Sequence, residues 1–114
     1  MKKKAIIISI KGTKLSSNEK KLLSNEYPWG LILFKRNIKS FNQTKLLIKE
    51  ARKLTKDNKF PIMIDEEGGT VARLSRIINN NFNQKIFGDL YQHNSKVGLF
   101  FFKKYIKNLS FFLK

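Results

Sequence analysis

The chain has 114 residues, of which 41% are apolar and 12% aromatic, so it can bury the core of one globular domain. It contains no cysteine, which excludes disulfides and thiolate metal sites. The 24 basic and 8 acidic residues give a formal net charge of +16, which favours a polyanionic partner. Most of the excess is lysine spread along the chain, a composition that AT-rich codons also produce, so charge alone assigns no function.

The amino terminus does not have the pattern of a targeting segment. Three lysines precede the short apolar run Ala5–Ile10, which is interrupted at Lys11 with no cleavage site of small residues. No stretch approaches the roughly 18 apolar residues that a membrane span needs. We therefore expect a cytoplasmic protein without a membrane span.

Three short apolar runs predict β-strands, at Ala5–Ile10, Gly30–Phe34 and Pro61–Ile64. The first is rich in β-branched residues and bounded by charge, which predicts a strand buried on both faces. Pro61 suits only the first position of its strand because it lacks a backbone N–H. The segment Asn25–Trp29, which contains a proline, is expected to be a loop.

The first predicted helix begins after Ser16, which has Glu19 three residues later, the spacing of a capping box. It covers about Ser17–Ser24, with Leu22 and Leu23 facing inward.

A second, longer helix is predicted from Ser40, which has Gln43 at the same spacing, to about Lys56. Its apolar face contains Leu47, Ala51 and Leu54. The resulting order β-α-β-α-β with short connections predicts an α/β fold, in which about three parallel strands form a sheet with helices packed outside it.

The chain beyond Asp65 is expected to be irregular, with a polar loop at Asn79–Asn81. A last helix is predicted after Asn94 or Ser95. Its apolar side would consist of Val97, Phe101, Leu109, Phe112 and Leu113.

The segment Asp65–Gly69 contains three of the eight acidic residues and directly follows the third predicted strand. Taken alone, an acidic stretch with two glycines is typical of a surface turn. In parallel α/β folds, however, polar groups at the carboxyl ends of strands line the active site. A carboxylate there can accept hydrogen bonds from sugar hydroxyls, and a nearby arginine can donate them.

Three segments in this order resemble motifs of the family 3 glycoside hydrolases of the β-N-acetylhexosaminidase type. They are Gly12–Ser16 (GTKLS), Gly30–Ile38 (GLILFKRNI) and Ile64–Leu74 (IDEEGGTVARL). The resemblance covers most of residues 10 to 90. It implies that residues 1–114 are the N-terminal portion of a (β/α)8 barrel domain.

The same resemblance implies two substrate-binding residues. Asp65 matches the aspartate that holds hydroxyls of the N-acetylglucosamine ring, and Arg73 matches the next substrate contact. Thr70 departs from the family pattern, which usually has arginine there.

Five further residues are expected to structure the site. Arg36 and Asn37 match a motif near its base. Glu67 is expected to brace the loop through backbone hydrogen bonds, and Gly68 and Gly69 to allow close backbone approach or positive φ.

No catalytic residue is expected within the chain. In the family pattern the nucleophilic aspartate and the histidine that protonates the leaving group lie well beyond residue 114. His93 is the only histidine and is expected to be a surface or capping residue. Asp65, Glu66 and Glu67 would lie on one side of the sugar, whereas retaining chemistry needs two carboxyl groups flanking the bond. No cofactor or metal is implied.

The resemblance therefore implies a fragment of a retaining glycoside hydrolase that removes terminal β-N-acetylglucosamine, as in the recycling of peptidoglycan muropeptides. Such a fragment would be inactive alone and marginally stable, or would associate with a complementing C-terminal barrel segment. One alternative is a basic module that binds nucleic acid or a membrane surface through Leu99–Lys114, although no specific nucleic-acid motif is present. Another is a truncated reading frame without function.

Overall fold

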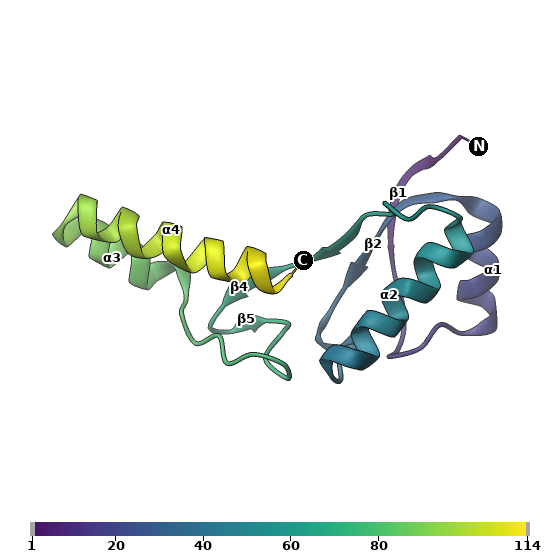
Figure 1. The fold of residues 1–114 in the computed structure, drawn as a ribbon, viewed down its shortest axis with the longest axis horizontal. Helices are drawn as coiled ribbons and strands as arrows, with labels where there is room; N and C mark the ends of the chain where they lie inside the picture. The colour runs from purple at the N-terminus through teal and green to yellow at the C-terminus, as the bar shows by residue number, and fades with distance from the viewer. Residues whose placement is uncertain (1, 114) are drawn as a thin grey trace. The chain divides into compact units, whose positions relative to one another are not determined.

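A computed structural model describes residues 2–113 of the chain (Figure 1). The helices and strands, in chain order, are β1 (Lys4–Ser9), α1 (Ser17–Glu26), β2 (Pro28–Leu33), the 3-10 turn η1 (Lys35–Asn37), α2 (Phe41–Thr55), β3 (Ile62–Ile64), β4 (Glu66–Gly68), β5 (Val71–Ala72), α3 (Gln84–His93) and α4 (Ser95–Phe112). They divide into two compact units. The first reaches to Glu66 and includes Val71–Asn80, and the second comprises Glu67–Thr70 and the chain from Asn81 onward.

The first unit is built on a three-stranded parallel sheet in the order β1-β2-β3. Ser9 of β1 is in register with Ile32 of β2, and Leu33 of β2 with Ile64 of β3. Strand, helix and strand alternate along the chain, so the predicted α/β class is confirmed.

The predicted capping box of α1 is confirmed. The Ser16 hydroxyl accepts a hydrogen bond from the Glu19 backbone N–H, and the Glu19 carboxylate accepts one from the Ser16 N–H at 2.7 Å. The α2 cap is half of such a box. Ser40 accepts from the Gln43 N–H, but the Gln43 side chain accepts from the Lys39 N–H instead of that of Ser40.

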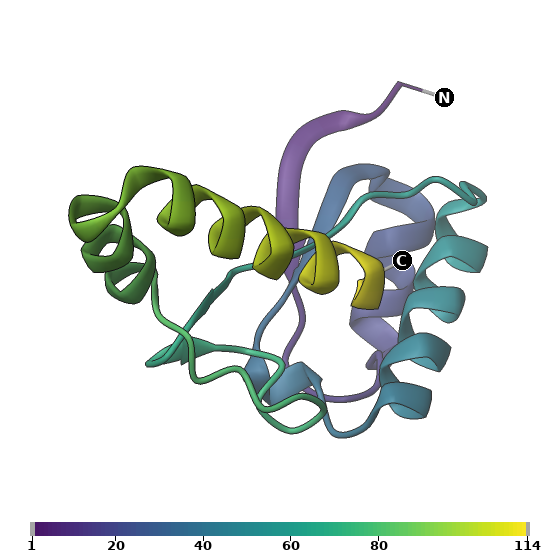
Figure 2. The same cartoon turned by 60° about the vertical axis from the view of Figure 1, so that its left-hand side comes forward.

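The core of the first unit lies between the sheet and the two helices. Figures 1 and 2 both show α1 and α2 beside one another, on one side of β1 and β2. The core residues are Ile10, Leu15, Leu23, Leu31, Leu33, Leu47, Ala51 and Phe60, with Leu54 packed against them. Each large side chain buried there contributes about 1.5–3 kcal/mol of hydrophobic stabilisation.

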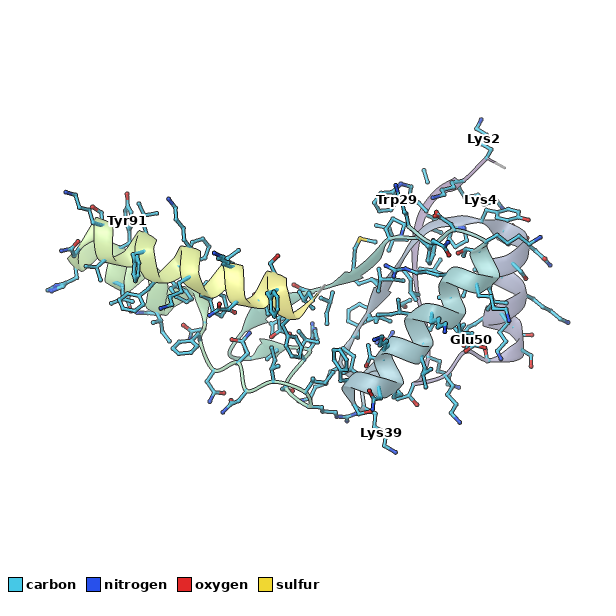
Figure 3. The ribbon with its side chains drawn as sticks, in the orientation of Figure 1. Lys2, Lys4, Trp29, Lys39, Glu50 and Tyr91 are labelled. Carbon is cyan, nitrogen blue, oxygen red and sulfur yellow. The ribbon has the colours of Figure 1, made fainter. Side chains whose placement is uncertain are left out.

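Two expectations about burial are wrong. Strand β1 is not buried on both faces, because Ile6 and Ile7 are 51% and 46% exposed. The strand pairs only with β2, and the helices cover one side of it. Trp29, near the start of β2 (Figure 3), is also exposed. In α1, Leu23 is buried as predicted but Leu22 is exposed, since adjacent helix positions point about 100° apart.

The loop predicted at Asn25–Trp29 is shorter than expected. Helix α1 ends at Glu26, its C-cap Tyr27 has a left-handed backbone with φ 46°, and β2 begins directly at Pro28. Proline is tolerated there because it occupies the first position of the strand.

The second unit is mainly a helical hairpin formed by α3 and α4. The Asn94 side chain caps α4 by accepting a hydrogen bond from the Val97 N–H at 3.2 Å, so the predicted last helix is confirmed. The expectation that the chain beyond Asp65 is irregular is wrong, because it misses α3 and the two-stranded pair β4–β5. Helix α3 begins after Asn83, whose side chain accepts a hydrogen bond from the Ile86 N–H.

Candidate active site

The candidate site is built at the carboxyl ends of β2 and β3. Phe34 directly follows β2, and Asp65 directly follows β3. Because Leu33 is in register with Ile64, Phe34 and Asp65 occupy the next pair of positions along the two strands. In parallel α/β folds this end of the sheet holds the functional groups.

Two arginines lie against the ring of Phe34. The guanidinium carbon of Arg36 is 4.6 Å from the ring centroid, and that of Arg73 is 5.6 Å away. Both distances are within the range of cation–π attraction. Sequence reasoning did not assign Phe34 a role, although an aromatic residue at a strand end, two positions before an arginine, was a usable signal.

Arg73 also faces Asp65, the other residue expected to bind substrate. Its Nη2 is 3.9 Å from Asp65 Oδ2, with the side chains 30% and 47% exposed. At that distance and exposure the ion pair contributes little to stability, on the order of 1 kcal/mol or less. The Arg73 Nε atom is buried, and within residues 2–113 it has no hydrogen-bond partner. The structure therefore brings together a carboxylate and a guanidinium that both retain hydrogen-bonding capacity.

Asn37 and Arg36 hold the backbone segments next to this pair in place through hydrogen bonds. The Asn37 side chain is fully buried, where its amide donates to the carbonyls of Ile10 and Gly12 and its oxygen accepts from the Phe34 N–H at 2.9 Å. The Arg36 Nε donates to the same Ile10 carbonyl at 3.1 Å. These bonds connect the segments that follow β1 and β2, and they hold the backbone of Phe34 in place.

The carboxylate that braces the loop is that of Glu66, not that of Glu67 as expected. Its Oε2 accepts from the Leu74 N–H at 2.9 Å and its Oε1 from the Asn80 side-chain amide at 2.8 Å. Glu67 is exposed. Alternation along the short strand β4 explains the exchange, because adjacent side chains point to opposite faces.

The two glycines of the loop have left-handed backbones. Gly68 has φ 80° and Gly69 has φ 59°, values that side-chain-bearing residues rarely adopt. A Cβ atom on Gly69 would also lie 3.0 Å from the Cβ atom of Asn83. Thr70, where the sequence departs from the family pattern, is exposed.

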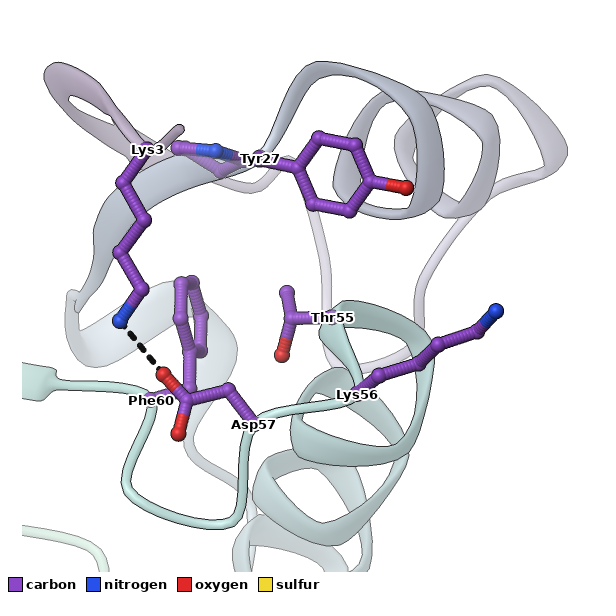
Figure 4. A pocket seen from close by; sticks show the side chains of 7 residues that line it. Lys3, Tyr27, Thr55, Lys56, Asp57 and Phe60 are labelled. Carbon is purple, nitrogen blue, oxygen red and sulfur yellow. Dashed lines mark hydrogen bonds and ion pairs between the residues drawn. The ribbon is translucent and has the colours of Figure 1, made fainter. Parts of the chain in front are cut away.

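Other features of the described residues do not add to the site. His93 is exposed at the end of α3, in the second unit. Residues 2–113 contain no group of three or more histidine, cysteine, aspartate or glutamate side chains arranged to hold a metal. A pocket lined by Lys3, Tyr27 and Phe60 and bordered by the Lys3–Asp57 ion pair (Figure 4) lies at the amino ends of the strands.

Comparison with known proteins identifies similar chains. No protein-family profile matches the sequence. The β-hexosaminidase of Haemophilus ducreyi is 43% identical over 89 residues, which cover 77% of this chain and 25% of that protein. The β-hexosaminidase of Thioalkalivibrio sulfidiphilus is 30% identical over 93 residues, covering 82% and 26%. The chain thus spans about a quarter of the length of these two curated relatives.

Solved structures give the same result. NagZ from Neisseria gonorrhoeae, in complex with N-trifluoroacetyl-D-glucosamine, superposes with a TM-score of 0.66 and 27% identity over 81% of this chain and 27% of that one. A glycoside hydrolase family 3 β-N-acetylglucosaminidase from a Paenibacillus species has a TM-score of 0.54 and 30% identity over 60% and 14%.

Proposed function

We propose that this chain, a relative of the family 3 glycoside hydrolases, supplies the sugar-binding part of a β-N-acetylhexosaminidase active site. The proposal rests on one observation: Arg73 faces Asp65 at the carboxyl ends of the parallel strands. It is supported by the 43% identity over 89 residues to a β-hexosaminidase. The three strands and their helices would then be the first part of a (β/α)8 barrel.

In this proposal Asp65 and Arg73 hold a terminal N-acetylglucosamine residue. The Asp65 carboxylate accepts hydrogen bonds from ring hydroxyls, and the Arg73 guanidinium donates to hydroxyl oxygens. Because their own ion pair is long and half-exposed, a sugar can enter between them at little cost.

The bond-breaking groups are proposed to come from a further segment of the barrel. Retaining hydrolysis uses two carboxyl groups roughly 5 Å apart on either side of the scissile bond, or one carboxylate and another proton donor. Asp65, Glu66 and Glu67 are consecutive and cannot flank a sugar ring. This chain alone would therefore show no turnover. The assembled enzyme would remove β-N-acetylglucosamine from muropeptides in the cytoplasm.

The test is a chimera in which this chain replaces the matched quarter of the Haemophilus ducreyi β-hexosaminidase. We expect it to hydrolyse a chromogenic N-acetyl-β-glucosaminide, while the chain alone does not. Asp65→Asn or Arg73→Lys in the chimera should lower kcat/KM by roughly tenfold to 100-fold, the effect of losing one hydrogen bond to a charged group.

Asp57→Asn is the matched control, because Asp57 pairs with Lys3 at the opposite end of the sheet. It should leave turnover unchanged. A folded chimera without activity, or turnover by the chain alone, would contradict the proposal. Full activity of both the Asp65→Asn and Arg73→Lys chimeras would remove these residues from the sugar site.

A further inference from the structure

Helix α4 has one side that combines lysines with phenylalanines. Within Ser95–Phe112 there are four lysines and no acidic residue. Because a helix repeats every 3.6 residues, one side of α4 contains Lys96, Phe100, Lys103, Lys104, Lys107 and Phe111. We call these six residues the lysine–phenylalanine face.

The side chains of this face are exposed. Phe100 is 59% exposed and Phe111 is 83% exposed, and all four lysines are exposed as well. Phe100 and the lysines at 103, 104 and 107 border a shallow, open hollow. The Lys104 ammonium is 5.9 Å from the Phe100 ring centroid, so charge and aromatic surface occur together.

Helix α3 packs on the opposite side of α4, so the lysine–phenylalanine face points away from α3. Gly98 is buried against Tyr91, labelled in Figure 3, and a Cβ atom at Gly98 would come within 2.5 Å of the Tyr91 backbone. Phe102 and Tyr105 pack on Phe87 with ring centroids 5.5 and 4.9 Å apart. The hairpin therefore uses one side of α4 for its own packing and presents the other.

We propose that the lysine–phenylalanine face binds the surface of an anionic phospholipid bilayer, with α4 lying in the plane of the interface. Lysines that border exposed phenylalanines attract anionic headgroups while the rings enter the acyl boundary. The apolar residues at the margins of this face, Leu99 and Ile106, are also exposed and extend the surface available for insertion.

Two observations favour a bilayer over nucleic acid. The charges on α4 are all lysine, with no arginine for bidentate contact to bases or phosphates. Its exposed apolar surface also includes leucine and isoleucine, which bury well in lipid but do not stack on bases. Among residues 2–113 no helix is long and apolar enough to cross a membrane, so the contact is interfacial.

The proposal is independent of the sugar site and is tested on the chain as it stands. In co-sedimentation, the chain should partition onto vesicles of phosphatidylcholine with phosphatidylglycerol and not onto pure phosphatidylcholine. Replacing Lys103, Lys104 and Lys107 by glutamine should weaken this partitioning roughly 100-fold, since each lysine near an anionic surface contributes roughly fivefold.

The matched control replaces Lys45, Lys49 and Lys53 by glutamine, three exposed lysines along one side of α2. It changes the net charge equally and should retain binding within about threefold. Equal loss in both triple variants would overturn the proposal in favour of general charge attraction. The proposal would also be overturned if the chain did not bind vesicles but bound single-stranded DNA in a salt-sensitive way. Loss of that DNA binding in the α4 variant would assign the face to nucleic acid.

Insertion of the phenylalanines into the bilayer is measured separately by tryptophan fluorescence. The variant carries Phe111→Trp together with Trp29→Phe, so that its one tryptophan lies on the lysine–phenylalanine face. Its emission should shift to shorter wavelength on anionic vesicles. Binding without any shift would show that the phenylalanines stay in water, and would overturn the interfacial geometry.

Discussion

At the residue scale, the fold depends on a few polar side chains that replace missing backbone partners. Asn37 is fully buried, yet its amide is satisfied by the carbonyls of Ile10 and Gly12 and by the Phe34 N–H. A buried polar group that is left unpaired costs about 1–3 kcal/mol. The arrangement therefore stabilises one path of the chain beneath the candidate site, which a hydrophobic residue at position 37 would not specify.

Glu19 has a comparable role at the start of α1, where it accepts hydrogen bonds from the Ser16 and Lys11 backbone N–H groups. Burial alone would raise the pKa of this carboxyl, but the hydrogen bonds from Ser16 and Lys11 outweigh burial and hold the pKa below its ordinary value. Folding lowers the pKa of this carboxyl, so the charged group stabilises the folded state at pH values above its ordinary, unfolded-state pKa. This stabilisation is lost as the pH falls from that value through the lower pKa of the folded state.

We predict that Glu19→Gln lowers the free energy of unfolding by about 0.5–1 kcal/mol at pH 7, the usual contribution of such a cap. The difference from the unmodified chain should shrink once the pH falls below about 4.3, the ordinary pKa of glutamate. Urea unfolding at pH 7 and pH 3 measures both values. An equal difference at the two pH values would contradict the assigned role of the charge.

At the element scale, the two helices of the second unit differ in how their glycines are used. Gly88 lies within α3 with nothing within 4 Å of the position that a Cβ would take. Gly98 lies in α4 where the backbone of Tyr91 comes within 2.5 Å of that position. The first glycine therefore only weakens its helix, whereas the second permits close packing of α3 on α4.

We predict opposite effects for the same substitution at these two positions. Gly88→Ala should raise helix stability by about 0.5–1 kcal/mol, because alanine loses less conformational entropy than glycine. Gly98→Ala should lower it by about 1–3 kcal/mol, since the added methyl group forces the helices apart. Thermal unfolding followed by circular dichroism at 222 nm compares the two variants. Equal melting temperatures would show that the helices do not pack as described.

At the scale of the whole molecule, the parallel sheet is incompletely covered. Within residues 2–113, β1 and β3 are the outer strands of the three-stranded sheet, and Ile6, Ile7 and Trp29 are exposed. Unpaired edges beside exposed apolar side chains favour pairing with further strands. In the proposed barrel, the complementing segment would cover these surfaces.

We predict that the isolated chain associates with itself, because the uncovered sheet is apolar. Sedimentation velocity should show an average mass that rises with concentration, and Ile7→Lys should shift the distribution towards the monomer. Lys45→Gln on α2 is a control that leaves the sheet unchanged. A monomer with a sharp unfolding transition that is independent of concentration would contradict this prediction.

Local signals in the sequence were sufficient for much of the fold. The sequence pattern predicted the strand that contains Gly30, the capping box of Ser16 and Glu19, and the last helix after Asn94. Each of these depends on neighbours a few residues away. Asp65 and Arg73 were named from their motif, although their roles in sugar binding remain proposals.

Other features were decided only by tertiary structure, because they depend on residues distant in sequence. Sequence pattern favoured a doubly buried β1, but burial depends on which sheet face the helices cover. Whether Glu66 or Glu67 braces the loop depended on which side chain turned towards Leu74. The cluster around the Phe34 ring joins residues 34, 36 and 73, and residue 73 comes near the other two only because β2 and β3 are paired in the sheet. Local patterns and motifs thus predicted the order of strands and helices along the chain and a resemblance to a family. Strand register and helix coverage decided which side chains meet.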